Sequence, residues 1–216
     1  MRQSVALVLA VMLGLSQAYT GLDTIAAISV AGFQCLVSNG YHFYIARVGE
    51  ETGGIDSGGL TNMKNAWSGG FSYVDAYIFP CHSSSCPSAK TQAQNTYNAL
   101  KNNGVKFGQI WVDVEISNWP SSQSTNQQFI SDMVSEIKAL GVAPGVYTNN
   151  NNWSTIVGIN WAGVKTASLW WANWSGQQNF NGFVAFGGWT KPNIRQYAGD
   201  VKGACSVGDV DLNWYP

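Results

Sequence analysis

The chain has few charged side chains and no excess of basic ones. Asp, Glu, Lys and Arg make up 11% of its 216 residues, and the formal net charge is −1 at pH 7. Proteins that bind nucleic acids or anionic membranes by long-range attraction carry clusters of Lys and Arg. The composition therefore argues against nucleic acid and against an anionic membrane surface as partners.

Metal ligands are scarce as well. The only histidines are His42 and His82, and no Cys-x-x-Cys pair occurs. Zinc sites are built from Cys and His at such spacings. We therefore expect no metal site, and the sequence indicates no other cofactor. His82, between two cysteines, is predicted to be a loop residue and not a catalytic base.

Long apolar runs are absent after the first twenty residues. Those residues, MRQSVALVLAVMLGLSQAYT, combine Arg2, an apolar stretch from Val5 to Leu15 and small residues up to Ala18. This is typical of a secretory signal peptide, and the apolar stretch is too short to span a bilayer. We expect cleavage after Ala18, one domain over residues 19–216, and a secreted monomer without a membrane anchor.

The four cysteines, Cys35, Cys81, Cys86 and Cys205, form an even set. In a chain expected to be secreted, an even set predicts two disulfides, although four cysteines allow three pairings. The short gap in CHSSSC favours Cys81 with Cys86. Cys35 would then tie an early element to the C-terminal region through Cys205.

What the sequence does contain is neutral polar residues and aromatics, including 10 Trp and 9 Tyr. A surface of amides, hydroxyls and aromatic rings suits a sugar ligand better than a charged one. A large share of the aromatics must nevertheless fill the core.

Short runs rich in Val, Ile, Tyr and Trp predict strands. They lie at Tyr19–Asp23, His42–Val48, Tyr73–Phe79, Gly108–Glu115, Gly145–Thr148, Leu169–Trp174, Ile194–Tyr197 and Val210–Trp214. Apolar residues at helical spacing predict helices at Val30–Ser38, Leu60–Ser68, Ser88–Asn103 and Thr125–Leu140.

Alternating strands and helices indicate a parallel sheet with helical crossovers. After about residue 165 the strands follow one another with little room for helices. The sequence therefore predicts an α/β fold, a modified TIM-like barrel whose last part has lost most of its helices. Asn149–Asn152 is predicted to be a loop, and Asn152 and Asn173 each begin a glycosylation acceptor pattern.

Acidic residues fall where these strands end. In GQIWVDVEISNW, Asp113 and Glu115 are two residues apart, so an extended strand places both on one face. Asp23 ends the first strand. Asp211 in GDVDLNWY can face the same end of the barrel if the last strand begins a little before Asp209. Active sites of β/α barrels lie at the carboxyl ends of the strands, so these carboxylates are expected to converge.

Paired acids among aromatics, without a nucleophilic triad or metal ligands, point to glycoside hydrolysis. Crowding of like charges raises at least one pKa, as a general acid requires, and we assign that role to Glu115. Asp75 is interpreted as a structural acid. Asp56 and Asp132 are interpreted as solvated charges, and Asp209 as a cap for the turn before Asp211.

The segments TGLDTIAAIS, YIFP, WVDVE, PGVYTN, LWWANW, RQYAG and VDLNWY resemble, in their order, the glycoside hydrolase family 25 lysozymes, especially the secreted invertebrate branch. The resemblance covers the whole chain after the leader. It implies five β/α units followed by three strands. It also implies cleavage of the β-1,4 bond between N-acetylmuramic acid and N-acetylglucosamine in bacterial peptidoglycan, in defence or digestion.

Carried over by position, the resemblance implies that Glu115 is the catalytic acid, with Asp113 beside it, Asp23 at the cup floor and Asp211 on the final strand. It implies glycan contacts at Tyr77, Tyr147, Trp171 and Gln196. In this family the second carboxylate is thought to assist the substrate's own N-acetyl group, which gives net retention. A glycosyl-enzyme or inversion through a bound water remains open, because each needs a different placement of the carboxylates.

Two other functions remain open. One is a glycan-binding protein that has lost its activity, against which the four intact acids argue. The other is a hydrolase of chitin-like N-acetylated glycans, since substrate assistance needs only the 2-acetamido group. The sequence also departs from bacterial members at Thr24–Ala27 and at Ile78, where a His is common, and this concerns specificity.

Overall fold

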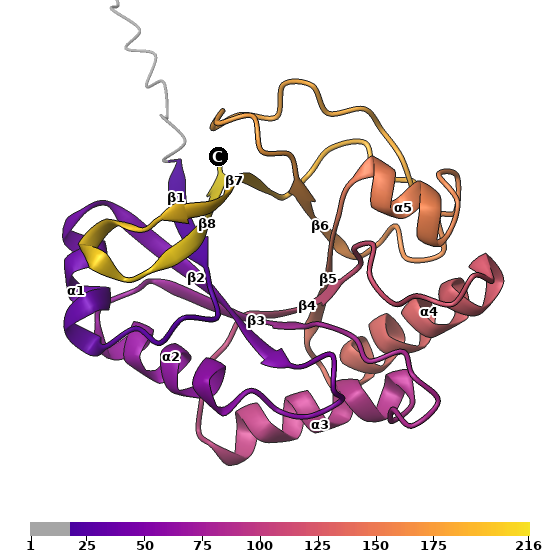
Figure 1. Ribbon diagram of the computed structural model, residues 1–216, viewed down its shortest axis with the longest axis horizontal. Coiled ribbons are helices and arrows are strands. Elements are labelled where there is room, and N and C mark those ends of the chain that lie inside the picture. The colour runs from indigo at the N-terminus through magenta and orange to yellow at the C-terminus, as the bar shows by residue number, and fades with distance from the viewer. Residues whose placement is uncertain (1–17) are drawn as a thin grey trace, which may run out of the picture.

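The strands form a closed barrel of eight, as the computed structural model of the chain shows for residues 18–216 (Figure 1). They follow one another around the barrel in chain order, so the first strand closes it against the last. The helices line the outside of the barrel over one part of its circumference (Figure 1). The predicted signal peptide falls on residues 1–17, which lie outside the described residues.

The strands are β1 (Tyr19–Asp23), β2 (Tyr41–Gly49), β3 (Tyr73–Ile78), β4 (Gln109–Asp113), β5 (Ala143–Thr148), β6 (Ser168–Ala172), β7 (Ile194–Lys202) and β8 (Asp209–Tyr215). The helices are α1 (Val30–Ser38), α2 (Ser57–Ser68), α3 (Ala89–Asn102), α4 (Gln123–Ala139) and α5 (Asn150–Ile156). A short 3-10 turn, Ala204–Ser206, joins β7 to β8.

Neighbouring strands from β1 to β7 are parallel, and β8 is antiparallel to both β7 and β1. One α-helix follows each of the first five strands, and none of the described residues between β6 and β8 forms another. The predicted architecture of five β/α units followed by three strands is therefore confirmed. Crossovers through helices explain why the first part is parallel, and the short β7–β8 connection explains why the last pair is not.

Each helix begins at a polar N-cap whose side chain accepts a hydrogen bond from a backbone N–H three residues later. This corrects the prediction for Asn149–Asn152. Asn149 is the N-cap of α5, and its side chain accepts from the Asn152 N–H. The polar run is thus a helix start and not a loop. The predicted β4 was also too long, because the strand ends at Asp113 and Glu115 lies in the loop after it.

Alternation along the strands produces two cores. The outer core lies between the barrel and its helices. The inner core fills the barrel itself with Phe43, Ile45, Trp111, Tyr147, Trp170 and Ile194. Trp111 needs the space left by a glycine on β5, because a Cβ on Gly145 would lie 2.1 Å from the indole ring. The interior of the barrel next to the carboxyl ends of the strands is therefore filled with side chains.

Both predicted disulfides are confirmed. Cys35 of α1 is bonded to Cys205 in the β7–β8 connection, and Cys81–Cys86 closes a short loop after β3. The first joins segments 170 residues apart in sequence and holds the last hairpin to the first helix. Within residues 18–216, no helix is both long and apolar enough to cross a membrane.

Candidate active site

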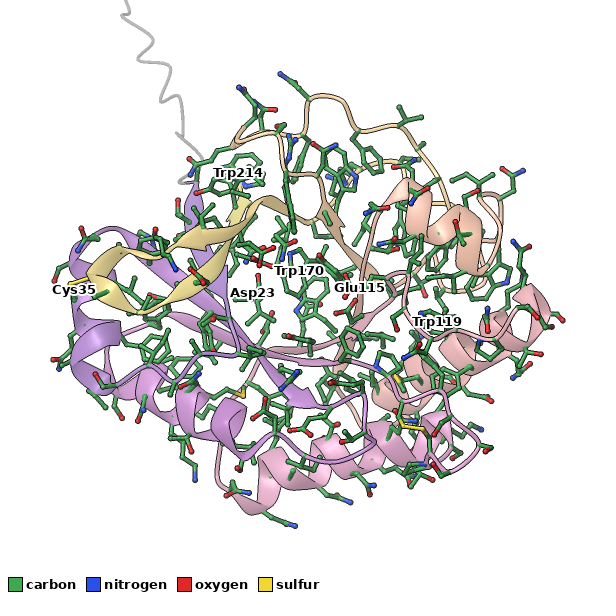
Figure 2. The ribbon with its side chains drawn as sticks, viewed as in Figure 1. Asp23, Cys35, Glu115, Trp119, Trp170 and Trp214 are labelled. Carbon is green, nitrogen blue, oxygen red and sulfur yellow. A yellow bond between two sulfur atoms is a disulfide. The ribbon has the colours of Figure 1, made fainter. Side chains whose placement is uncertain are left out.

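The four acids picked out in the sequence come together at the carboxyl ends of the parallel strands. Asp23 is the last residue of β1, Asp113 is the last residue of β4, and Glu115 follows two residues later. Asp211 lies directly opposite Asp23 in the β1–β8 ladder, because β8 begins at Asp209. Figure 2 shows Asp23, Trp170 and Glu115 within the ring of strands.

A buried amide joins Asp23 to Asp211. The Gln196 Nε2 donates to Asp23 Oδ1 and to Asp211 Oδ2, each at 3.1 Å. Asn213 Nδ2 donates to the same Asp23 oxygen at 2.6 Å. Like charges directly opposite in a ladder repel, so these donors offset part of the cost of holding the two carboxyls together.

The orientation of Gln196 is fixed by its other end. Its Oε1 accepts from the Tyr147 hydroxyl at 2.7 Å and from Trp174 Nε1 at 2.8 Å. The amide therefore uses both donors and both acceptor positions. Gln196 is 1% exposed and Tyr147 is 7% exposed. The resemblance implied glycan contacts for both, whereas the structure places them as supports that hold the acids in place.

Asp113 has less hydrogen-bond support than Asp23 and Asp211. It is buried, and its Oδ1 has no hydrogen-bond partner in the described structure. Burial raises the pKa of Asp113 well above its ordinary value, and the nearby charges of Glu115 and Asp23 raise it further. A buried acceptor without a donor is costly, so this oxygen gains no hydrogen bond that would stabilise the charged form of the carboxyl.

The pKa values of the other three acids are raised as well. Burial raises the pKa of Glu115, and the charge of Asp211 adds to this. Burial and the charge of Asp211 also raise the pKa of Asp23, against the opposing hydrogen bonds from Asn213 and Gln196. Burial raises that of Asp211. The four groups titrate together, so the cluster retains protons at pH values where isolated carboxyls have lost them.

Aromatic rings support the cluster from below and from the side. Trp170 is 2% exposed and its Nε1 donates to Asn213 Oδ1 at 2.7 Å, which aims the Asn213 amide at Asp23. The Tyr147 and Tyr77 rings meet Trp170 edge-on, with centroids 4.6 and 6.3 Å away. Tyr77, a predicted glycan contact, is half-buried at the carboxyl end of β3.

Trp171 lies apart from the site. It faces the outer core, is 2% exposed, and carries the Arg195 guanidinium 4.7 Å above its ring. The glycan contact implied for Trp171 is therefore corrected, because the residue points away from the barrel mouth. Trp174, which the sequence analysis missed, is 56% exposed and bonded to Gln196. The strand period of two puts Trp170 and Trp171 on opposite faces of β6, and Trp174 lies in the segment that follows this strand.

Asp75 and Asp56 have structural roles. Asp75 lies in the barrel wall and accepts from the Gln109 N–H and from Trp111 Nε1, which confirms the structural interpretation. Asp56 was interpreted as a solvated charge, and this is wrong. It is the N-cap of α2 and pairs with Arg47 Nε at 3.0 Å.

The remaining polar residues lie outside the cluster. Asp132 pairs with Lys90 and Asp209 with Lys202, both at the surface. His82 lies in the Cys81–Cys86 loop, as predicted. No group of three His, Cys, Asp or Glu side chains in residues 18–216 could hold a metal ion.

A carboxyl that keeps its proton beside other carboxyls is the arrangement that glycoside hydrolases use. A family model described as "Lysozyme-like protein 1" matches residues 15–197. Lysozyme-like protein 5 of Caenorhabditis elegans is 40% identical over 93% of each chain. Probable GH family 25 lysozyme 4 of Dictyostelium discoideum is 38% identical over 95% of this chain and 94% of its own.

Among solved structures, a family GH25 lysozyme from Aspergillus fumigatus shares the fold, with a TM-score of 0.72 at 19% identity over 93% of this chain and 94% of its own. The chain belongs to the glycoside hydrolase family 25 lysozymes, and it is a glycoside hydrolase.

Proposed function

We propose that this protein is a lysozyme that hydrolyses the β-1,4 bond between N-acetylmuramic acid and N-acetylglucosamine in bacterial peptidoglycan. The observation that carries the proposal is the meeting of Asp23, Asp113, Glu115 and Asp211 at one end of the barrel, with raised pKa values. The relatives named as lysozymes support the choice of substrate.

Glu115 is the general acid in this proposal. Its raised pKa favours the protonated form, and this form delivers its proton to the glycosidic oxygen as the bond to the anomeric carbon breaks. Asp23 and Asp211 supply negative charge near the positive charge that develops on the sugar. The leaving sugar departs as an alcohol, and Glu115 is left as a carboxylate.

Asp113 assists the substrate's own acetamido group. Asp113 is 8% exposed at the carboxyl end of β4, and in this proposal its carboxyl accepts the acetamido N–H. The acetamido oxygen then attacks the anomeric carbon from the face opposite the leaving group and forms an oxazolinium ion. Water opens this ion as Glu115 takes up a proton from the water, and the two displacements together give net retention.

The cellular setting is also a proposal. Two disulfides favour an oxidising compartment, so we infer a secreted monomer whose mature domain covers residues 19–216. The neutral polar composition and net charge of −1 suit a mildly acidic lumen, where the enzyme serves in the digestion of bacteria or in defence against them.

A comparison of substrates tests the proposal. Purified peptidoglycan and chitin oligomers are incubated with the mature protein, and the sugar at each new reducing end is identified together with its first-formed anomer. Muramic acid ends that appear first as the β anomer support the proposal. Faster release from chitin oligomers supports a hydrolase of chitin-like glycans, which the acceptor on Asp113 also fits. Binding of peptidoglycan without release of ends supports the inactive binding protein.

A further inference from the structure

Glu115 lies beyond the part of β4 that the sheet holds. The last contacts of the strand with β5 are made by Val114, whose N–H donates to the Tyr147 carbonyl at 2.8 Å and whose carbonyl accepts from Thr148 Oγ1 at 2.7 Å. After Val114 the chain leaves the ladder. The direction of the Glu115 side chain therefore depends on the loop that follows.

In that loop the Glu115 carbonyl has a side-chain donor. Trp119 Nε1 donates to it at 2.9 Å, four residues later in the chain. The N–H of the same peptide group, contributed by Ile116, makes a longer hydrogen bond to Asn152 Oδ1 at 3.3 Å. A bond to a residue's own carbonyl fixes the plane of its peptide, and that plane sets the direction in which its side chain leaves the backbone.

Two rings hold Trp119 in turn. The His82 ring lies over the indole with centroids 3.7 Å apart at an interplanar angle of 36°, and Phe129 of α4 meets the indole edge-on at 5.9 Å. A cavity of about 230 Å³, lined by these three residues and the disulfide loop, lies beside them. Because the indole has open space next to it, its position depends on the ring contacts and not on close packing from every side.

His82 is itself fixed by the Cys81–Cys86 loop. The disulfide closes that loop around it, and Gln92 of α3 anchors Cys81 twice. The Gln92 Nε2 donates to the Cys81 carbonyl, and the Cys81 N–H donates to Gln92 Oε1, both at 3.0 Å. Burial lowers the pKa of His82 to about 4, so the ring that stacks on Trp119 is neutral above that pH.

We propose that Trp119 and His82 are positioning residues that hold Glu115 in its catalytic direction, and that the Cys81–Cys86 loop gives this support its rigidity. The proposal rests on the proposed function, in which Glu115 is the general acid. A misplacement of about 1 Å at a reacting group can cost about a hundredfold in rate. Figure 2 shows Trp119 on the side of Glu115 away from Asp23, so the support comes from outside the carboxylate cluster.

Trp119→Phe is the sharpest variant, because it keeps an aromatic ring beneath His82 and removes the N–H donor together with part of the indole. Trp67→Phe is its matched control. Trp67 is also half-buried, and its Nε1 donates to the Lys106 carbonyl at 2.7 Å, next to the amino end of β4. We expect kcat of Trp119→Phe to fall about tenfold with KM within about twofold, and Trp67→Phe to keep the wild-type values.

A second pair of variants tests the stack without touching the hydrogen bond. His82→Phe keeps a ring over Trp119 and is expected to keep most of the activity, whereas His82→Ala loses the ring and is expected to lower kcat. This rescue by a conservative change would not follow if His82 served as an acid or base. It also keeps the test valid if Trp119→Phe folds poorly.

Amide hydrogen exchange of residues 114–117 gives a readout that needs no activity. We expect faster exchange there in Trp119→Phe and His82→Ala, and unchanged exchange in Trp67→Phe. Unchanged exchange in the first two, or faster exchange with unchanged kcat, overturns the proposal. If the wild type releases no reducing ends, the proposed function fails. The exchange data then decide alone whether Trp119 and His82 hold the Glu115 segment, and unchanged exchange overturns that too.

Discussion

Two acids on neighbouring strands lie at opposite ends of the barrel, and they differ in their hydrogen bonds. Asp75, in β3, accepts from the Gln109 N–H and Trp111 Nε1, both at 2.9 Å. Asp113, at the carboxyl end of β4, leaves Oδ1 without a partner. The acid that serves the fold has both carboxyl oxygens in hydrogen bonds, whereas the acid of the candidate site leaves one oxygen without a partner.

The pKa values show the same contrast in their causes. Burial raises the pKa of Asp75, and hydrogen bonds from Trp111 and the backbone work against it. Burial raises the pKa of Asp113 too, but there the charges of Glu115 and Asp23 add to the rise and no hydrogen bond opposes it. Both acids lie among aromatic side chains, so the difference comes from their polar neighbours.

The largest effect expected from this contrast is on activity. Glu115→Gln keeps the shape of the side chain and removes its proton, and we expect kcat to fall at least about a thousandfold, a loss of about 4 kcal/mol in transition-state stabilisation. Asp75→Asn, at the other end, is expected to keep kcat within about twofold per folded molecule. Release of reducing ends from peptidoglycan measures both. A comparable loss in Asp75→Asn would remove the distinction between the two ends.

The next effect is on stability at the amino end. Asp75→Ala leaves the Gln109 N–H and the Trp111 Nε1–H without their acceptor, and we expect the free energy of unfolding to fall by about 1–3 kcal/mol. Urea denaturation at pH 7 measures it. An unchanged midpoint would show that Asp75 is as dispensable to the fold as a surface charge, with the exposed Asp209 as the reference for such a charge.

At the carboxyl end of the strands, we expect removal of an acid to raise the stability of the protein and not to lower it. A carboxyl whose pKa is raised in the folded state binds its proton more tightly there, so stability falls as pH rises from the unfolded value of about 3.9 through the raised one. Asp113→Asn removes that cost, and at pH 7 we expect Tm to rise by about 2–4 °C, the shift that about 1 kcal/mol gives in a chain of this size.

The gain from Asp113→Asn should disappear below about pH 3.9, where the carboxyl is protonated in both states. Activity should fall at the same time, since an amide offers the substrate N–H a weaker acceptor. Calorimetric scans at several pH values check the first statement. A loss of stability at pH 7 would mean that Asp113 has a partner that supports the fold.

The smallest expected effect is a shift of a pH profile. The charge of Asp211 raises the pKa of Glu115, so Asp211→Asn should lower that pKa and move the basic limb of kcat/KM to lower pH. The pH at the midpoint of the basic limb is the readout, because the maximum value of kcat/KM is expected to change as well. A limb that stays in place would show that burial alone sets the Glu115 pKa.

Most of the barrel was predictable because each buried strand is a short run of Val, Ile and aromatic residues between turn signals. The prediction failed where a polar residue had a structural task that spacing does not reveal. Asn149 caps α5, so a run of asparagines that looked like a loop begins a helix. The end of β4 was misplaced because Glu115 continues the alternation of the strand after the ladder has ended.

The four acids of the site were predictable from strand ends and from the family motifs. The supporting role of Gln196, which was expected to contact glycan, and that of Asn213 were not. Gln196 and Asn213 act through the register of β7, β8 and β1, which brings residues up to 190 positions apart into hydrogen bonds. Trp171 was chosen although the strand period of two puts it on the face opposite Trp170, and Trp174 was missed because it lies beyond the end of β6.

The most direct test of the account is the titration of Glu115 itself. The carboxyl carbon of Glu115 is followed by NMR against pH, and kcat/KM for peptidoglycan is measured over the same range. The account predicts a Glu115 midpoint above the ordinary glutamate value of about 4.3 that coincides with the basic limb of activity. A midpoint at or below that value, or a limb that does not follow it, would contradict the role of Glu115 as the acid of this cluster.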